Sequence, residues 1–152
     1  MISIRKADLG DQQIITLVKT HKQLAMHNSD PCANHALDMK DFATETITLW
    51  ALWDQEVVLS IGALQKIDTH TGEIKTMFTH PDHQGKGLGK QMLQHLLDQA
   101  RHLELTTLYL ETGRWSYFIA ARKLYTRFGF TECAAFSDYQ DHPDSIFMRC
   151  SL

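Results

Sequence analysis

The sequence has few cysteines, few prolines and no long apolar run, and these shortages exclude several classes of protein. Its three cysteines are odd in number and widely spaced over 152 residues, which argues against a disulfide framework and predicts reduced thiols in a cytoplasmic protein. No apolar stretch approaches the ~20 residues needed to cross a bilayer, and the start at 1–5 shows no signal-peptide core. A membrane partner is therefore not expected.

An excess of basic charge is also missing. The net charge is −3 and the isoelectric point is about 6.3, which argues against a general nucleic-acid binder, because binding to a phosphate backbone requires a basic face. The apolar fraction of 43% and the charged fraction of 22% are typical of a soluble globular protein. There is no repeat, low-complexity tract or linker-like change of composition, so we expect one domain over residues 1–152.

The apolar patterning predicts alternating strands and helices. Residues such as Leu88, Met92 and Leu96 recur at helical spacing. Turn residues separate the β-rich runs. We expect helices at 8–28, 88–100 and 117–128, the last closed by Gly129, and strands at 2–6, 46–53, 57–65, 73–79, 106–110, 130–133 and 146–150. Hairpins precede a β-α-β crossover, which predicts an α/β fold with a mixed, mostly antiparallel sheet of six to seven strands and helices on both faces.

Glycine is scarce overall but concentrated in one place. Of the 8 glycines, three fall within the stretch from Thr79 to Lys90, at positions 85, 87 and 89, directly before a helix-patterned segment. Glycines let a backbone approach an anion closely, and the start of a helix offers free N–H groups and a positive dipole end. The loop therefore predicts a site for a phosphate-containing ligand.

Two common phosphate motifs do not fit this loop. A P-loop needs a glycine where Gln84 stands and a hydroxyl where Gln91 follows Lys90. A dinucleotide fold needs a third glycine at a wider spacing and a place in an amino-terminal β-α-β unit, which the mid-chain loop does not have. A nucleotide-binding protein remains an alternative. Comparing the binding of acetyl-CoA with that of ATP would distinguish it from an acyl-CoA-binding protein.

A third pattern fits, and it resembles a known family. Gln84-x-x-Gly87-x-Gly89 after a strand is similar to the acyl-CoA pyrophosphate loop of the GNAT superfamily of N-acetyltransferases. The block from Ala121 to Phe130 resembles the helix Ala-x-x-Leu-Tyr-x-x-x-Gly-Phe that follows in these enzymes. The predicted order of elements is similar to the GNAT sheet over nearly the whole chain. The resemblance implies an acetyl-CoA co-substrate. No metal is expected, because no Cys-x-x-Cys or His-Glu-x-x-His motif accompanies His80 and His83.

The resemblance also implies site residues. The strand before the loop would contact the pantetheine arm, and the loop would bind the pyrophosphate, which gives these positions for binding acetyl-CoA: Met77, Phe78, Thr79, Gln84, Gly85, Lys86, Gly87, Leu88, Gly89 and Lys90. A backbone N–H of Met77 or Thr79 would polarise the carbonyl oxygen. Tyr125 corresponds to the tyrosine that protonates the leaving thiolate, since its pKa of about 10 suits a thiol of about 8.5.

The acceptor must lose a proton before it attacks. Glu73 is the first candidate base, directly or through a water, and Glu111 the second, although either could instead pair with a nearby cation such as Lys75. We expect direct transfer in a ternary complex to the amine of a small molecule or peptide, and a homodimer is plausible by resemblance. A non-catalytic acyl-CoA-binding module is the alternative. One departure is Phe118, which stands where the family commonly has an asparagine for pantetheine.

Overall fold

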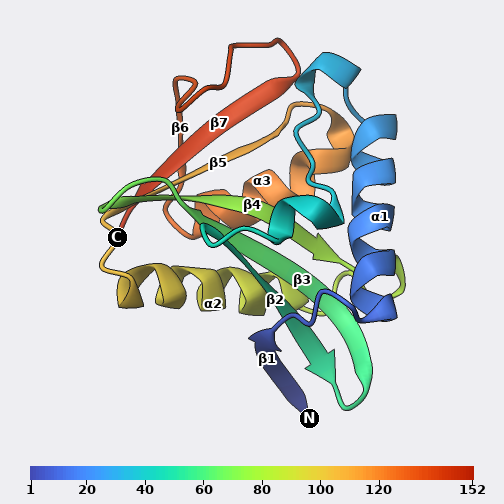
Figure 1. Cartoon of the computed structure of the whole chain (residues 1–152). Helices are drawn as coiled ribbons and strands as arrows, with labels where there is room; N and C mark the ends of the chain where they lie inside the picture. The colour runs from blue at the N-terminus through green and yellow to red at the C-terminus, as the bar shows by residue number, and fades with distance from the viewer.

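The computed structural model describes residues 1–152 and contains one seven-stranded sheet with helices on both faces (Figure 1). The strand order is β1-β2-β3-β4-β5-β7-β6, and every neighbouring pair is antiparallel except β4 and β5. The strands are β1 Ile2–Lys6, β2 Ile47–Asp54, β3 Val57–Lys66, β4 Thr71–Thr79, β5 Thr107–Gly113, β6 Thr131–Cys133 and β7 Ser145–Ser151. The predicted fold class is confirmed.

Three α-helices flank the sheet: α1 Gln12–His27, α2 Leu88–His102 and α3 Ile119–Arg127. Short 3₁₀ turns η1 to η4 cover Pro31–Ala33, Met39–Phe42, Pro81–His83 and Ser116–Phe118. Apolar side chains of α1 pack on one face of the sheet, and those of α2 and α3 pack on the other. None of these helices combines the length and the hydropathy that a membrane span requires.

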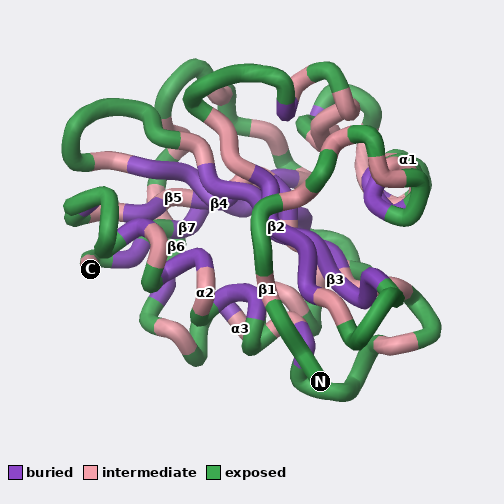
Figure 2. Tube along the Cα trace, turned by 60° about the horizontal axis from the view of Figure 1, so that its bottom comes forward, coloured by how far each residue is buried: buried purple, intermediate pink, exposed green.

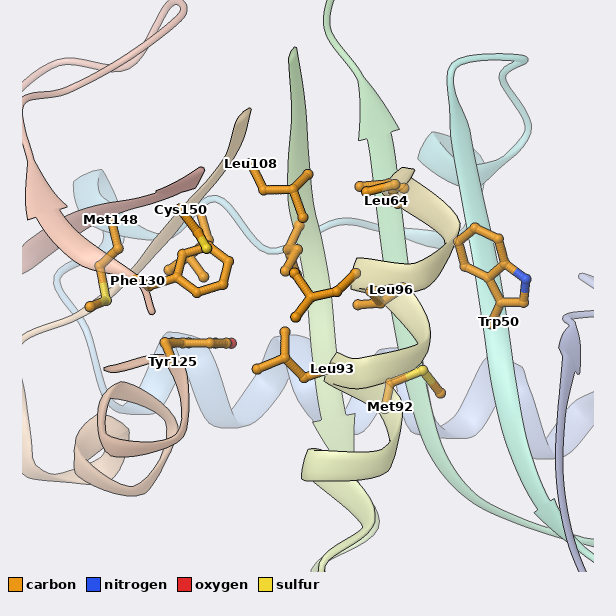
Figure 3. Packing of buried hydrophobic residues seen from close by; sticks show 14 of the residues in the cluster. Trp50, Leu64, Met92, Leu93, Leu96, Leu108, Tyr125, Phe130, Met148 and Cys150 are labelled. Atoms are coloured by element: carbon orange, nitrogen blue, oxygen red, sulfur yellow. The ribbon is translucent and has the colours of Figure 1, made fainter. Parts of the chain in front are cut away.

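The larger part of the core lies between the sheet and α2. The apolar side of α2 is fully enclosed, as Met92, Leu93 and Leu96 are each 0% exposed, because its apolar residues recur along one stripe. Figure 3 shows these side chains pointing at strand residues such as Leu108, with Tyr125 and Phe130 beside them. In Figure 2 the buried residues follow the central strands, while the connecting loops are exposed.

The parallel pair β4–β5 is short. The two strands are in register only from Thr71 with Thr107 to Ile74 with Leu110. Beyond that point β5 continues along β7, and β4 continues along β3. The strands therefore separate in the middle of the sheet, and the second half of β4 presents an edge without a neighbouring strand on the β5 side.

A bulge in β4 lies at the same point. Ala63 of β3 faces Thr76 and Leu64 faces Ile74, so Lys75 is an extra residue with no partner on β3. A bulge reverses the alternation of side chains beyond it. Ile74 accordingly packs in the α2 layer, whereas Phe78, four residues later, packs in the α1 layer.

Several predicted boundaries need correction. The first helix starts at Gln12 and not at Asp8, because the Asp8 carboxylate accepts from the N–H of Gly10 in a turn and Asp11 caps the helix. The third helix starts at Ile119, after a 3₁₀ turn. Strand β5 runs on to Gly113, because pairing with β7 continues after β4 has separated. The predicted closure at Gly129 is confirmed: its φ is +94°, and Phe130 N–H donates to Tyr125 C=O over 3.1 Å.

Candidate active site

The glycine loop between β4 and α2 presents a row of free backbone donors. No backbone N–H from Gln84 to Lys90 donates to a backbone acceptor of the protein. Gly85 and Gly87 both have φ of +79°, and a Cβ added at either would meet no atom within 4 Å. Positive φ turns successive N–H groups toward a common side. The loop therefore fits an anion of the size of a phosphate.

The side chains of this loop contribute unequally. Leu88 is buried in the core, so only its backbone is available to a ligand. Lys90 lines the adjoining cavity, whereas Lys86 does not and places its Nζ 3.1 Å from His83 Nδ1. Lysines at a helix start oppose the helix dipole unless an anion is bound there. Of the two, Lys90 is in the better position to bind an anion.

A cavity of about 860 Å³ runs from this loop into the gap between β4 and β5. Met77, Phe78 and Thr79, from the half of β4 that has no partner on β5, line it. Its far wall is formed by α1, by loop residues before and after η1, and by Tyr139 of the segment between β6 and β7. No group of three or more His, Cys, Asp or Glu residues in the protein could hold a metal ion.

Glu73 lies on the wall of this cavity in a fixed set of contacts. The residue is only 4% exposed, and its Oε2 accepts from the Tyr139 hydroxyl at 2.6 Å and from Lys75 Nζ at 3.3 Å. Lys75 Nζ also donates to the Tyr139 hydroxyl at 2.8 Å. Burial raises the pKa of Glu73, while the Lys75 charge and the Tyr139 hydrogen bond oppose that rise. The contacts thus favour an ionised carboxylate.

Glu111 lies on β5, one residue beyond the last β4–β5 pair, on the same side of the sheet as Glu73. It has no hydrogen bond or ion pair within the protein although it lines the cavity. Burial raises its pKa to about 8, and the nearby charge of Glu73 adds to the rise while Lys75 opposes it. Glu111 is therefore mostly protonated at pH 7 and gains its charge just above neutrality.

Tyr125 reaches the cavity from the opposite side of the sheet. It extends from α3 into the core beside Phe130, at 5.9 Å between ring centroids, and is 7% exposed. Its hydroxyl makes no hydrogen bond to the protein, and the residue is part of the cavity lining. Burial raises the pKa of Tyr125, and the charge of Glu111 adds to this. The phenol thus keeps its proton at neutral pH and is a weaker acid than a free tyrosine.

Comparison with known proteins identifies the family. The family model described as "Acetyltransferase (GNAT) family" matches residues 17–130. The chain belongs to the GNAT family of acetyltransferases. It is 40% identical to the N-acetyltransferase YsnE of Bacillus subtilis, over 98% of this chain and 99% of YsnE. A crystal structure of an acyl-CoA N-acyltransferase from Klebsiella pneumoniae superposes with a TM-score of 0.83 at 30% identity, covering 100% of this chain and 98% of that one. YncA of Salmonella typhimurium, solved with acetyl-CoA, superposes at 0.74 with 20% identity, covering 99% and 93%.

This GNAT protein is an acyl-CoA-dependent acetyltransferase, and the predicted resemblance is confirmed. The structure brings nearly all the predicted site residues to one cavity, where Glu73, Met77, Phe78, Thr79 and Tyr125 are joined by loop residues Gln84, Gly85, Gly87, Leu88, Gly89 and Lys90. Lys86 is the exception and stays outside it. The Phe118 departure also has a structural reason, because its ring packs directly on Gly113, where a Cβ would clash with it. An apolar contact thus occupies the position of the family's asparagine.

Sequence reasoning about this GNAT enzyme missed Tyr139 and understated Lys75. Tyr139 is 66 residues from Glu73 and lies in a segment without regular structure, so no local spacing connects the two. Lys75 is predicted only as a structural partner of Glu73. The segment that carries Tyr139 has no recognisable motif of its own.

Proposed function

We propose that this enzyme transfers the acetyl group of acetyl-CoA directly to the amine of a small molecule or peptide held in the same cavity. One observation carries the proposal: the gap between β4 and β5 has a carboxylate pair, Glu73 and Glu111, on one side and the Tyr125 hydroxyl on the other. An amine on the first side and a thiolate leaving toward the second is the arrangement that acyl transfer in a ternary complex needs.

Acetyl-CoA fits the other end of the cavity. The free N–H groups of residues 84–90 suit its pyrophosphate, and the unpaired edge of β4 at Met77 to Thr79 suits the amide groups of its pantetheine arm. When bound, acetyl-CoA supplies an activated thioester carbonyl. A backbone N–H at Met77 or Thr79 would hydrogen-bond to that carbonyl oxygen as negative charge develops on it.

The contacts support Glu111 over Glu73 as the group that takes the proton from the acceptor ammonium. Glu73 Oε2 already accepts two hydrogen bonds, whereas the Glu111 carboxyl has no partner and a pKa of about 8. This pKa is closer to the pKa of an alkyl ammonium than the pKa of an ordinary carboxylate is. An entering ammonium also favours the ionised form of Glu111. Glu73 as the base, the first choice from the sequence, stays a prediction.

Tyr125 supplies the proton that the leaving thiolate needs. Glu111 accepts one proton from the ammonium, the amine lone pair forms the new C–N bond, and the C–S bond breaks. Tyr125 then donates its proton to the leaving sulfur. The nitrogen that has formed the new bond loses its second proton, which restores the Tyr125 phenol through solvent in the cavity, and Glu111 releases its proton to solvent. No cysteine is needed: of the three, none lines the cavity.

The proposal is tested by measuring free CoA release from acetyl-CoA with amino acids, polyamines, aminoglycosides and peptide amino termini. We expect turnover with at least one class. Tyr125→Phe should lower kcat by about 10²-fold at unchanged KM for acetyl-CoA. Glu111→Gln should remove the rise of activity with pH near 8, whereas Glu73→Gln should shift that rise to lower pH. Tight acetyl-CoA binding without turnover by any acceptor would favour a binding module instead.

Two further expectations from the sequence stay predictions. A homodimer would be detected by light scattering of the purified protein, and a cytoplasmic location by cell fractionation. The mechanism does not need a dimer, because every residue assigned a role comes from one chain.

A further inference from the structure

The segment between β6 and β7, residues 134–144, contributes Tyr139 and Asp144 to the lining of the cavity. Of the two, Tyr139 contacts Glu73, and its ring is held on several sides. His35 lies edge-on at 4.9 Å, Phe136 at 5.1 Å and Phe147 at 5.6 Å between ring centroids. With its ring fixed in this way, the hydroxyl has little freedom of direction.

The Tyr139 hydroxyl joins two oppositely charged groups. It donates to Glu73 Oε2 at 2.6 Å and accepts from Lys75 Nζ at 2.8 Å. Hydrogen bonds to an ionised partner are short and are roughly twice as strong as neutral ones. Lys75 lies two residues after Glu73 on β4, so both side chains can reach the same cavity, which both line. The three groups close a small hydrogen-bonded triangle.

We propose that Tyr139 is a positioning residue of the catalytic centre, whose hydroxyl, together with Lys75, holds the Glu73 carboxylate in one orientation and in its charged form beside Glu111. The proposal rests on the proposed function for its kinetic consequence but not for its structural part. It gives the segment of residues 134–144 a role in catalysis.

The charged surroundings of Glu73 are few, and each comes from a different element. Lys75 of β4 and Tyr139 favour its charged form, while burial opposes it. Across the gap, the Glu111 charge adds to the burial that raises the pKa of Tyr125 of α3. The Lys75 charge adds to the burial that lowers the pKa of His35. Since the Glu73 charge in turn raises the pKa of Glu111, a change at Tyr139 reaches the proposed base through Glu73.

The test reads the titration of Glu73 directly and needs no turnover. Carboxyl ¹³C signals of labelled glutamate are followed with pH in Glu111→Gln, which leaves Glu73 as the one carboxyl of the pair, and the signal is assigned by adding Glu73→Gln. Introducing Tyr139→Phe into Glu111→Gln should raise the pKa of Glu73 by about one to two pH units, because a hydrogen bond to a charged group is lost.

A matched control is available on the neighbouring strand. Tyr109 stacks on Phe136 in the same aromatic group, at 4.7 Å, but its hydroxyl has no hydrogen-bond partner and it does not line the cavity. Tyr109→Phe should leave the Glu73 titration unchanged. An unchanged titration in Tyr139→Phe, or an equal shift in Tyr109→Phe, would overturn the proposal.

Kinetics supply the second readout. Tyr139→Phe should lower kcat about tenfold while KM for acetyl-CoA stays the same, since acetyl-CoA binds at the other end of the cavity. If Tyr139→Phe does not fold, as judged by circular dichroism, Lys75→Met removes the other partner of the same oxygen and should raise the pKa of Glu73 as well. Absence of turnover in the wild type would refute the proposed function, whereas the ¹³C result decides the role of Tyr139 in either case.

Discussion

Replacing Glu111 by glutamine should stabilise the folded protein at neutral pH, although it should impair activity. Glu111 is half-buried without a hydrogen bond, and its pKa is raised from 4.5 to about 8. Its proton is therefore bound more tightly in the folded than in the unfolded chain. Below pH 4.5 both states hold the proton, and the side chain has no pH-dependent effect on stability. As pH rises toward 8, the unfolded state releases the proton first and the folded state loses relative stability.

The magnitude follows from the pKa difference. Between the two values the free energy of unfolding falls by about 1.4 kcal/mol per pH unit, so the cost reaches about 3 kcal/mol at pH 7. Glutamine cannot ionise and avoids this cost while keeping nearly the same shape. Glu111→Gln should thus match the wild type near pH 4 and exceed its unfolding free energy by up to about 3 kcal/mol at pH 7, which is an upper value because water can relax around the group.

Urea unfolding at pH 4, 5.5, 7 and 8.5 measures this difference. Comparing variant with wild type at each pH cancels every other titrating group that the substitution does not touch. Glu132→Gln, on the exposed edge strand β6, serves as the control and should show no such trend. A difference between Glu111→Gln and wild type that is constant over this range, or that favours the wild type at pH 7, would refute the account of Glu111 given above.

Three further predictions concern the loop and the core. Gly87→Ala should weaken CoA binding measured by calorimetry at least tenfold, because its Cβ would enter the space where the free N–H groups converge and its φ of +79° strains any L side chain, by about 1 kcal/mol; equal affinity would argue against the anion site. Lys90→Ala should raise KM for acetyl-CoA more than Lys86→Ala does, since Lys90 alone lines the cavity; the opposite order would contradict this placement. Phe130→Ala should lower the unfolding free energy by about 3–5 kcal/mol, because Phe130 is 1% exposed within the main core; a loss below about 1 kcal/mol in urea would show that the core collapses around the gap.

The sequence predicts the parts of this molecule that depend on neighbouring residues in the chain. The loop from Gln84 to Lys90 could be recognised because the glycines that shape it are adjacent, and α2 because its apolar residues recur every three or four positions. Helix starts were less accurate. At Asp8 a turn competes with the helix through a side-chain hydrogen bond, which apolar periodicity does not register.

The pairing of distant side chains could not be predicted. Glu73 was recognised as functional, but whether it is free or held depends on Tyr139, whose position is fixed by aromatic packing on β7. Similarly, the pKa of Glu111 depends on how deeply it is buried and on a charge from another strand. Such properties arise only when the sheet is assembled, and a single sequence contains no local record of them.

The bulge at Lys75 also means that strand β4 has one residue more than its pairing with β3 uses. Removing Lys75 would leave Ile74 opposite Leu64 and Thr76 opposite Ala63, so the residues from Thr76 to Thr79 would keep their faces of the sheet. Phe78 would stay in the layer under α1, whereas Glu73 would lose the cation beside it. The strand could thus lose its extra residue without a change of register, and the loss would be felt at the carboxylate and not in the core. In a deletion scan along β4, we expect Lys75 to be the position whose removal the fold tolerates best.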